Sequence, residues 1–335
     1  MHEAAVEDAT SGAVVTFVGR IRDHDPGAQG EVTGIDYSHH PDAERILGEV
    51  LGSKRDDVVL ASKARTAVGN GPNDSGASRI HLTRAVEDSL RRLRTDHLDL
   101  LYLHQWDGQT PITETIATAD ELIRAGKIRY WGVSNFNGWQ LAKTVYEARA
   151  AGLQGPIAHQ AYYTPEAREI EYEIVPAARD LGIATFGWSP LGEGLLNGRV
   201  RRGAETPADT RQGTGWPEPH VVDRDRAYDL IELFGEIAGE LGWTIPQVVI
   251  SWILGRPGID GTVIAARRFE HLTEDLDAAE LTLPQEARDR ITTASQLPAY
   301  YPLWHRLLNG QDRPEPAEAE FYAEQRGHVL GEEQA

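Results

Sequence analysis

The sequence has no cysteine and no long apolar run, and each absence excludes a class of protein. Without cysteine there is no disulfide, no thiolate nucleophile and no cysteine-based metal site. Basic residues are also scarce: 33 Lys and Arg face 52 Asp and Glu, and the net charge of −19 disfavours nucleic acid or an anionic membrane as the main partner. The first residues, MHEAAVEDAT, have no basic start followed by an apolar stretch, so we expect no signal peptide, no membrane span and a cytoplasmic location.

What the sequence does have is a regular alternation of apolar runs and helical patterns. Its 335 residues, 40% of them apolar, can form one large α/β domain or two smaller ones. Short apolar runs alternate with segments of helical periodicity, which indicates parallel strands joined by helices. The predicted strands are 57–63, 98–104, 128–134, 157–163, 183–190 and 262–268, and the predicted helices are 78–93 (with Ser78 as N-cap), 112–125, 138–152, 170–181, 224–241, 246–254 and 269–281.

Two further strand-like runs, 13–19 and 31–38, lie upstream and bring the number of strands to eight. Eight strands with helical connections predict an α/β fold of the (β/α)8 TIM barrel type. The alternative is an open doubly wound sheet, but the turn GRIRDHDPGAQG after the first strand does not fit G-x-G-x-x-G. That short polar connection also lacks the helix that a parallel strand pair needs. We therefore expect the first two strands to be atypical.

Polar residues follow the strands where a parallel barrel has its active site, at the carboxyl ends. Taken singly, each of these residues can be an ordinary solvated strand end. Together they predict one mouth lined with functional groups. The residues at the six strand ends are Lys63, His104, Ser134–Asn135, Gln160 to Tyr163, Trp188–Ser189 and Arg267–Arg268.

Several motifs give the chain from about residue 46 to 308 a strong resemblance to the aldo-keto reductases. They include DVVLASK, HLDLLYLHQWD, GKIRYWGVSNF, WSPLGEGLLNG and VIAARRFEHLTEDL, in the order and spacing of that family. The resemblance implies a (β/α)8 barrel that uses NADPH, without a metal, to reduce small-molecule aldehydes and ketones.

The resemblance also implies a role for each matching residue. Lys63 and His104 match catalytic residues, and Trp188 matches the aromatic residue that stacks on the nicotinamide. The residues that match the family's other cofactor contacts are Ser134, Asn135 and Gln160 at the nicotinamide carboxamide, Ser189 and Leu191 at the pyrophosphate, and Arg267, Arg268 and Asp275 at the adenosine phosphate. The arginines favour a 2′-phosphate, and hence NADPH over NADH, whereas Asp275 replaces the usual asparagine and opposes it.

One catalytic residue of the family is missing from the sequence. Its acid is a tyrosine a few residues after a strand-end aspartate, and Asp36 matches only the aspartate. Tyr37 is adjacent to Asp36, so its side chain would point to the opposite face of the strand. His39 and His40 lie nearer to the expected position, although an ordinary solvated loop is the favoured interpretation. Scattered histidines are weak evidence for a metal, and we predict no metal site.

The N-terminal stretch has a second resemblance, to the start of the molybdopterin synthase catalytic subunit. It covers about residues 3–50 and includes GAVVTFVGRIRDHD, with Arg20, Arg22 and His24, and YSHHPDAE. The synthase's later lysines have no counterpart. We therefore interpret the chain as a gene fusion with three parts: a synthase-like segment (1–45) that supplies two strands, a reductase barrel (46–310) and an acidic, mobile tail (311–335).

Three functions follow from these resemblances. The first is an active aldo-keto reductase with a remodelled entrance. The second is a non-catalytic NADPH-binding barrel, because the family tyrosine is absent. The third is a partner-binding fusion in molybdenum-cofactor assembly.

Overall fold

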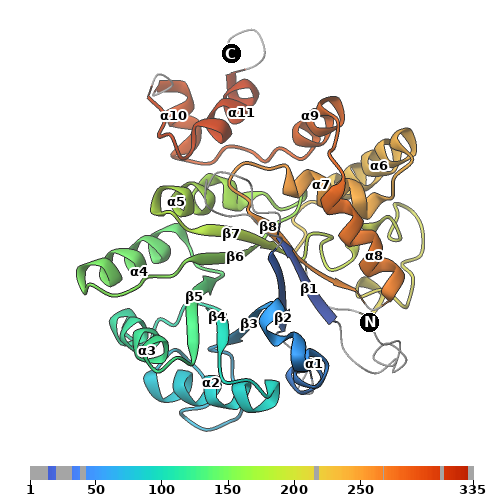
Figure 1. Ribbon diagram of the computed structural model, residues 1–335. Coiled ribbons are helices and arrows are strands. Elements are labelled where there is room, and N and C mark those ends of the chain that lie inside the picture. The colour runs from blue at the N-terminus through green and yellow to red at the C-terminus, as the bar shows by residue number, and fades with distance from the viewer. Residues whose placement is uncertain are drawn as a thin grey trace.

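The computed structural model describes residues 14–19, 32–37, 43–214, 219–266, 268–309 and 313–330. Of residues 14–19, 32–37 and 327–330 it describes the backbone alone. The strands form one curved sheet, and helices α1 to α8 lie around its outside (Figure 1).

The strands lie where the apolar runs predict them, with ends shifted by at most two residues. Each strand pairs with the next one along the chain. The strands are β1 (Val14–Gly19), β2 (Val32–Tyr37), β3 (Val59–Ala64), β4 (Leu98–Leu103), β5 (Ile128–Ser134), β6 (Ala158–Tyr162), β7 (Ala184–Trp188) and β8 (Gly261–Ala266).

The helices α2 to α8 agree with the seven predicted segments, α1 precedes them, and three further helices, α9 to α11, follow them toward the C-terminus. The helices are α1 (Ala43–Leu51), α2 (Arg79–Leu93), α3 (Ile112–Arg124), α4 (Gly138–Ala150), α5 (Ile174–Leu181), α6 (Arg224–Leu241), α7 (Ile245–Leu254), α8 (Phe269–Asp277), α9 (Gln285–Ala294), α10 (Leu303–Asn309) and α11 (Ala319–Leu330). Ser78 caps α2 as predicted, because its Oγ accepts a hydrogen bond from the backbone N–H of His81 at 3.4 Å.

The pairing directions show which part of the barrel prediction holds. The six strands β3 to β8 are parallel, and β2 joins them parallel to β3. β1 lies between β2 and β8 and runs antiparallel to both, with Phe17 opposite Gly34 and Val14 opposite Ala266. The α/β class and the parallel sheet are therefore confirmed, but a regular (β/α)8 barrel is not what the structure shows. The atypical arrangement expected for both first strands applies to β1 only.

Two apolar clusters hold the helices against the sheet. One lies under α1 to α5 and includes Trp131, and the other lies around α6, α7 and α9 and includes Trp252. Both indoles are almost fully buried, at 1% and 0% exposure. Burying such large apolar side chains contributes strongly to stability, so these clusters fix the helices that follow the strand ends.

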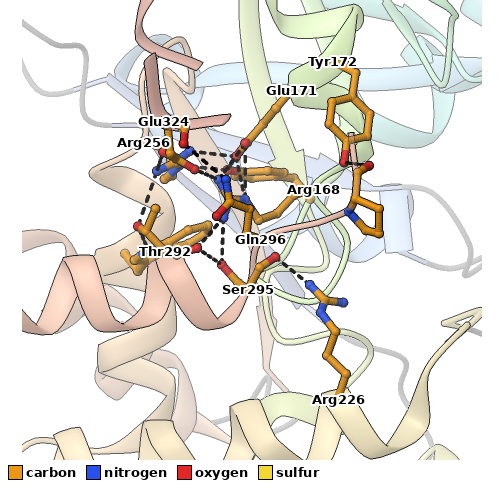
Figure 2. Close-up of polar contacts among 12 residues, drawn as sticks. Arg168, Glu171, Tyr172, Arg226, Arg256, Thr292, Ser295, Gln296 and Glu324 are labelled. Carbon is orange, nitrogen blue, oxygen red and sulfur yellow. Dashed lines mark hydrogen bonds and ion pairs between the residues drawn. The ribbon is translucent and has the colours of Figure 1, made fainter. Parts of the chain in front are cut away.

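The C-terminal segment differs from the mobile tail that the composition predicts. α11 packs on the body of the protein beside α5, and its Phe321 and Tyr322 are buried. Glu324 of the same helix reaches two buried arginines, Arg168 and Arg256 (Figure 2). Residues 319–326 are therefore part of the fold, because their aromatic and acidic side chains have partners that composition alone does not reveal.

No single helix in the described ranges is long and apolar enough to cross a membrane. α6 and α7 meet the length and composition criterion only as a pair, which is bent by 98°. Both helices bury their apolar faces in the cluster around Trp252.

Candidate active site

The candidate site lies at the carboxyl ends of the parallel strands. Lys63 is at the end of β3, His104 follows β4, Ser134 ends β5 and Trp188 ends β7. Gln160 on β6 is in register with Ser134. Because adjacent parallel strands end at the same edge, the structure brings these residues to one mouth, as the sequence predicts.

Two hydrogen bonds hold the first strand ends together around Lys63 and His104. The N–H of His104 donates to the carbonyl of Ala64 at 2.9 Å, and the Asn135 Nδ2 donates to the carbonyl of His104 at 3.1 Å. Lys63 is half-buried, and its Nζ lies 6.0 Å from the ring centroid of Tyr102. A cation near an imidazole can stabilise negative charge that develops on an oxygen between them.

Tyr102 does not take the place of the family tyrosine as a surface acid. It pairs in register with Lys63, but its side chain is 0% exposed. A hydroxyl that gives its proton to substrate has to reach the substrate oxygen, which a fully buried ring does not.

Asn135 links three strand ends through its side chain. Its φ of 57° lies in the left-handed region, which asparagine tolerates better than most residues. Its Oδ1 accepts a hydrogen bond from the Nε1 of Trp188 at 3.0 Å, while its Nδ2 contacts His104. Within the described residues, one further N–H and one lone pair of this amide have no partner, and a carboxamide could pair with both.

Ser134 offers the clearest test of whether the site fits a nicotinamide. The side chain is 1% exposed, and its Oγ has no hydrogen-bond partner among the described residues. A buried hydroxyl without a partner is costly, so a group that supplies one would be favoured there. Gln160, in register with it on β6, is 2% exposed and adds a second buried polar group.

The segment after β7 forms a turn stabilised from within. Ser189 has a φ of 52°, its Oγ donates to Glu193, and its carbonyl accepts from the N–H of Gly192 at 2.8 Å. Glu193 also pairs with Arg211 of the long loop that follows. Leu191 packs between two apolar clusters, so the predicted pyrophosphate loop is held in one conformation.

The predicted adenosine-phosphate residues lie apart from these, after β8. Arg268 precedes α8 and is exposed, whereas Arg267 lies outside the described residues. Asp275 of α8 is only 6% exposed. Burial, followed by the nearby charge of Glu274, raises the pKa of Asp275 to about 7. A carboxyl here is therefore partly neutral near pH 7, and a neutral carboxyl can donate a hydrogen bond as an amide does.

The remaining N-terminal candidates are described only in part. Asp36 lies on β2 opposite Ala61 of β3, so its backbone is at the same edge as Lys63. Its side chain, together with His39, His40, Arg20, Arg22 and His24, lies outside what the structure describes. A catalytic role for Asp36 stays a prediction.

One buried acid near the mouth was missed by sequence reasoning. Glu166 lies in the loop after β6 and is 5% exposed. Burial raises its pKa to about 7, although Arg226 opposes the shift. A glutamate in a loop between a strand and a helix gives no sign of burial, so only the packing reveals it. Among the described residues, no group of three or more histidine, aspartate or glutamate side chains could hold a metal ion.

Comparison with known proteins gives consistent results. The sequence model of the Aldo/keto reductase family matches residues 34–296. An uncharacterized oxidoreductase of Bacillus subtilis, YrpG, is 35% identical over 250 residues, which cover 72% of this chain and 74% of that protein. A probable voltage-gated potassium channel subunit beta of Arabidopsis thaliana is 34% identical over 246 residues, or 71% and 74% of the two chains. Norsolorinic acid reductase B of Dothistroma septosporum is 27% identical over 280 residues, or 80% and 69%.

The family match also bears on the N-terminal segment. It begins at residue 34, and therefore includes part of the segment that sequence reasoning assigns to a molybdopterin-synthase-like origin. These comparisons lend no support to that second resemblance. The relatives support aldo/keto reduction in general and a small-molecule carbonyl substrate.

Proposed function

The chain belongs to the aldo/keto reductase family, and from that premise we propose that it reduces an aldehyde or ketone with NADPH. The observation that carries the proposal is the common edge at which Lys63, His104, Ser134 and Trp188 lie. This arrangement combines a cation, an imidazole, a buried hydroxyl and an indole on neighbouring strand ends.

The residues on β5, β6 and β7 would hold the nicotinamide. When bound, the reduced nicotinamide supplies the hydride. Among the residues that the structure describes, the buried hydroxyl of Ser134 has no partner, and the amide of Asn135 keeps one donor and one acceptor unused. Gln160 adds a buried amide, and Trp188 offers an aromatic face. These groups would bind the ring and hold it in one orientation.

Lys63 and His104 would act on the carbonyl oxygen. Donors at the oxygen stabilise the alkoxide that develops as the hydride arrives. His104 in its protonated form would donate a hydrogen bond and then its proton to this oxygen, which completes the alcohol, and the positive charge of Lys63 would stabilise the alkoxide before that transfer. General acid catalysis of this kind contributes about 10²–10⁴-fold to the rate.

The preference for NADPH over NADH rests on the residues after β8. Arg267 and Arg268 would bind a 2′-phosphate through charge-assisted hydrogen bonds. Asp275 opposes this in its ionised form, and its raised pKa weakens the opposition near pH 7.

Replacing Asp275 by asparagine is expected to stabilise the protein at pH 8 and much less at pH 5. Because the pKa of Asp275 is raised to about 7 in the folded protein, the chain takes up a proton at this carboxyl on folding. The free energy of unfolding therefore falls as the pH rises from about 4 to about 7. Removing the charge is expected to raise the free energy of unfolding by about 2–4 kcal/mol at pH 8. Urea unfolding at the two pH values measures the effect. Asp277→Asn, at an exposed position of the same helix, is the matched control. Equal stabilisation at both pH values would contradict the burial argument.

A non-catalytic NADPH-binding protein is the second candidate function. The expectation that no tyrosine takes the place of the family acid, since Tyr37 is adjacent to Asp36, favours it. The relative from Arabidopsis thaliana is named as a channel subunit, so family membership alone does not imply turnover.

Two measurements distinguish these functions. NADPH is expected to quench the fluorescence of Trp188, and the quenching should be lost in Trp188→Phe. NADPH is then expected to be consumed with at least one member of a panel of aldehydes and ketones. Quenching without consumption would support the non-catalytic function, and absence of both would overturn the assignment of the cofactor.

A further inference from the structure

Arg65, the first residue after β3, has an unusual backbone conformation. Its φ is 106°, in a region that favours glycine and that residues with a Cβ rarely adopt. Such a conformation is costly and persists only where the surrounding structure enforces it, most often at functional sites. Arg65 comes two residues after Lys63, so the strained backbone lies directly beside a proposed catalytic group.

The side chain of Arg65 crosses from the loop after β3 to the loop after β4. Its Nη2 donates to the backbone carbonyl of Trp106 at 3.0 Å. Trp106 is two residues after His104, whose own N–H donates to the carbonyl of Ala64 at 2.9 Å. The backbone around His104 is therefore held at two points: β3 binds its N–H, and Arg65 binds the carbonyl two residues further on.

Further hydrogen bonds fix the two loops that Arg65 joins. The carbonyl of Arg65 accepts from the N–H of Gly76 at 2.9 Å, which closes the loop after β3. The Oδ2 of Asp107 accepts from the N–H of Ala77 at 2.8 Å, and so ties the far end of this loop to the loop after β4. The backbone of Arg65 is thus fixed in one loop while its guanidinium reaches the other, and these contacts enforce its conformation.

Arg65 carries two features that cost stability. Its backbone lies in the region that favours glycine, and its Nε is buried without a hydrogen-bond partner among the described residues. Local costs of this kind are typical of positions where function requires a particular geometry. What the residue supplies in return is a direct link between the ends of β3 and β4, the strands that precede His104 and carry Lys63.

We propose that Arg65 is a positioning residue, which holds His104 at a fixed distance from Lys63 through the carbonyl of Trp106. The proposal rests on the proposed function, because it takes Lys63 and His104 to act together on the carbonyl oxygen of a substrate. Donors stabilise a developing alkoxide best when they are already in place, and small displacements of a catalytic group are costly. Loss of Arg65 should therefore slow the chemical step and leave NADPH binding unchanged.

Two substitutions separate positioning from stability. Arg65→Ala removes the hydrogen bond to Trp106 and keeps the unfavourable backbone, whereas Arg65→Gly removes both. We expect Arg65→Gly to unfold at a higher temperature than Arg65→Ala. Both variants should nevertheless lose about 10- to 100-fold in kcat for an aldehyde that the wild type reduces with NADPH. The dissociation constant of NADPH should not change.

Arg84→Ala is the matched control. Arg84 also donates to a backbone carbonyl of the loop after β3, that of Asn73 at 2.9 Å, but it does so from α2 and does not reach the loop after β4. Its variant should keep the kcat of the wild type. Positioning by Arg65 would be overturned, and the reductase would stand, if kcat were unchanged in both Arg65 variants, if it recovered in Arg65→Gly together with the unfolding temperature, or if Arg84→Ala lost as much.

Amide hydrogen exchange tests the same geometry without turnover. The N–H of His104 is bonded to the carbonyl of Ala64, and the N–H of Asn135, at the next strand end, is bonded to the carbonyl of Gln160 at 3.0 Å. In Arg65→Gly, exchange of the His104 amide, followed by NMR, should become about 10-fold faster while that of Asn135 does not change.

The exchange measurement decides the proposal even if the proposed function fails. If the wild type reduced no aldehyde or ketone, the reductase assignment would be overturned, and faster exchange confined to His104 would still support its positioning by Arg65. Unchanged exchange at His104, or an equal acceleration at Asn135, would overturn that positioning. Arg65→Gly is the variant of choice because relief of the strained backbone favours its folding.

Discussion

Lys63→Met is expected to lower kcat/KM for NADPH-dependent carbonyl reduction by about 10²–10⁴-fold. Methionine keeps the approximate length of the side chain and removes the positive charge from the end of β3. Without that charge, the alkoxide that develops beside His104 loses its cationic partner. Steady-state kinetics with a reactive aldehyde measure the effect, and the loss should fall on kcat because the charge acts in the transition state.

The control for this variant is a lysine away from the mouth. Lys143 is exposed on α4, and Lys143→Met should leave kcat/KM unchanged within about 2-fold, as expected of surface substitutions. NADPH affinity of Lys63→Met should stay close to that of the wild type, because the proposed nicotinamide contacts come from β5, β6 and β7. Unchanged turnover in Lys63→Met would overturn the proposed mechanism, whatever the cofactor affinity.

Glu171→Gln is expected to lower the free energy of unfolding by about 3–5 kcal/mol. Glu171 is 3% exposed and lies between two buried arginines (Figure 2). Its Oε2 lies 2.8 Å from the Arg168 Nη2, and its Oε1 lies 3.1 Å from the Arg256 Nη2. A glutamine would leave two buried cations with Glu324 as the remaining carboxylate in this network. Removing one member of a buried ion pair is costly because the other member keeps its desolvation penalty.

The pH dependence of stability gives a second test of the same network. Burial by itself would raise the pKa of Glu171, but the charges of Arg168 and Arg256 outweigh it and lower the pKa. Its contribution to stability is therefore present above the ordinary glutamate pKa and is lost as pH falls through the lowered value. Urea unfolding should show a steeper loss toward acid in the wild type than in Glu171→Gln.

An exposed ion pair provides the matched control for Glu171. Glu320 pairs with Arg179 at 2.9 Å, but its side chain is 57% exposed. Glu320→Gln should change the free energy of unfolding by less than about 1 kcal/mol, because surface pairs contribute little. If the two variants were equally stable, the buried network would not be what holds α11 and the loop after β6.

Apolar periodicity and strand-end chemistry predicted much of this protein. The six strands from β3 to β8 and the helices around them follow local patterns of side chains, which residues close in sequence determine. The same patterns predicted the strand ends at which Lys63, His104, Ser134 and Trp188 lie. Parallel strands end at one edge, so the position of these residues in the sequence sufficed to group them.

Contacts between distant residues could not be predicted in this way. The antiparallel direction of β1 depends on its pairing with both β2 and β8. The packing of α11 depends on Glu324 reaching Arg168 and Arg256, far away in the sequence, where composition predicted a mobile tail. The buried Oγ of Ser134 and the raised pKa of Glu166 depend likewise on what surrounds each side chain. The sequence by itself therefore determined the helices, the strands and the order of polar groups along one edge. Only the tertiary structure decided strand direction, burial and partners, because these are set by long-range packing that no local pattern encodes.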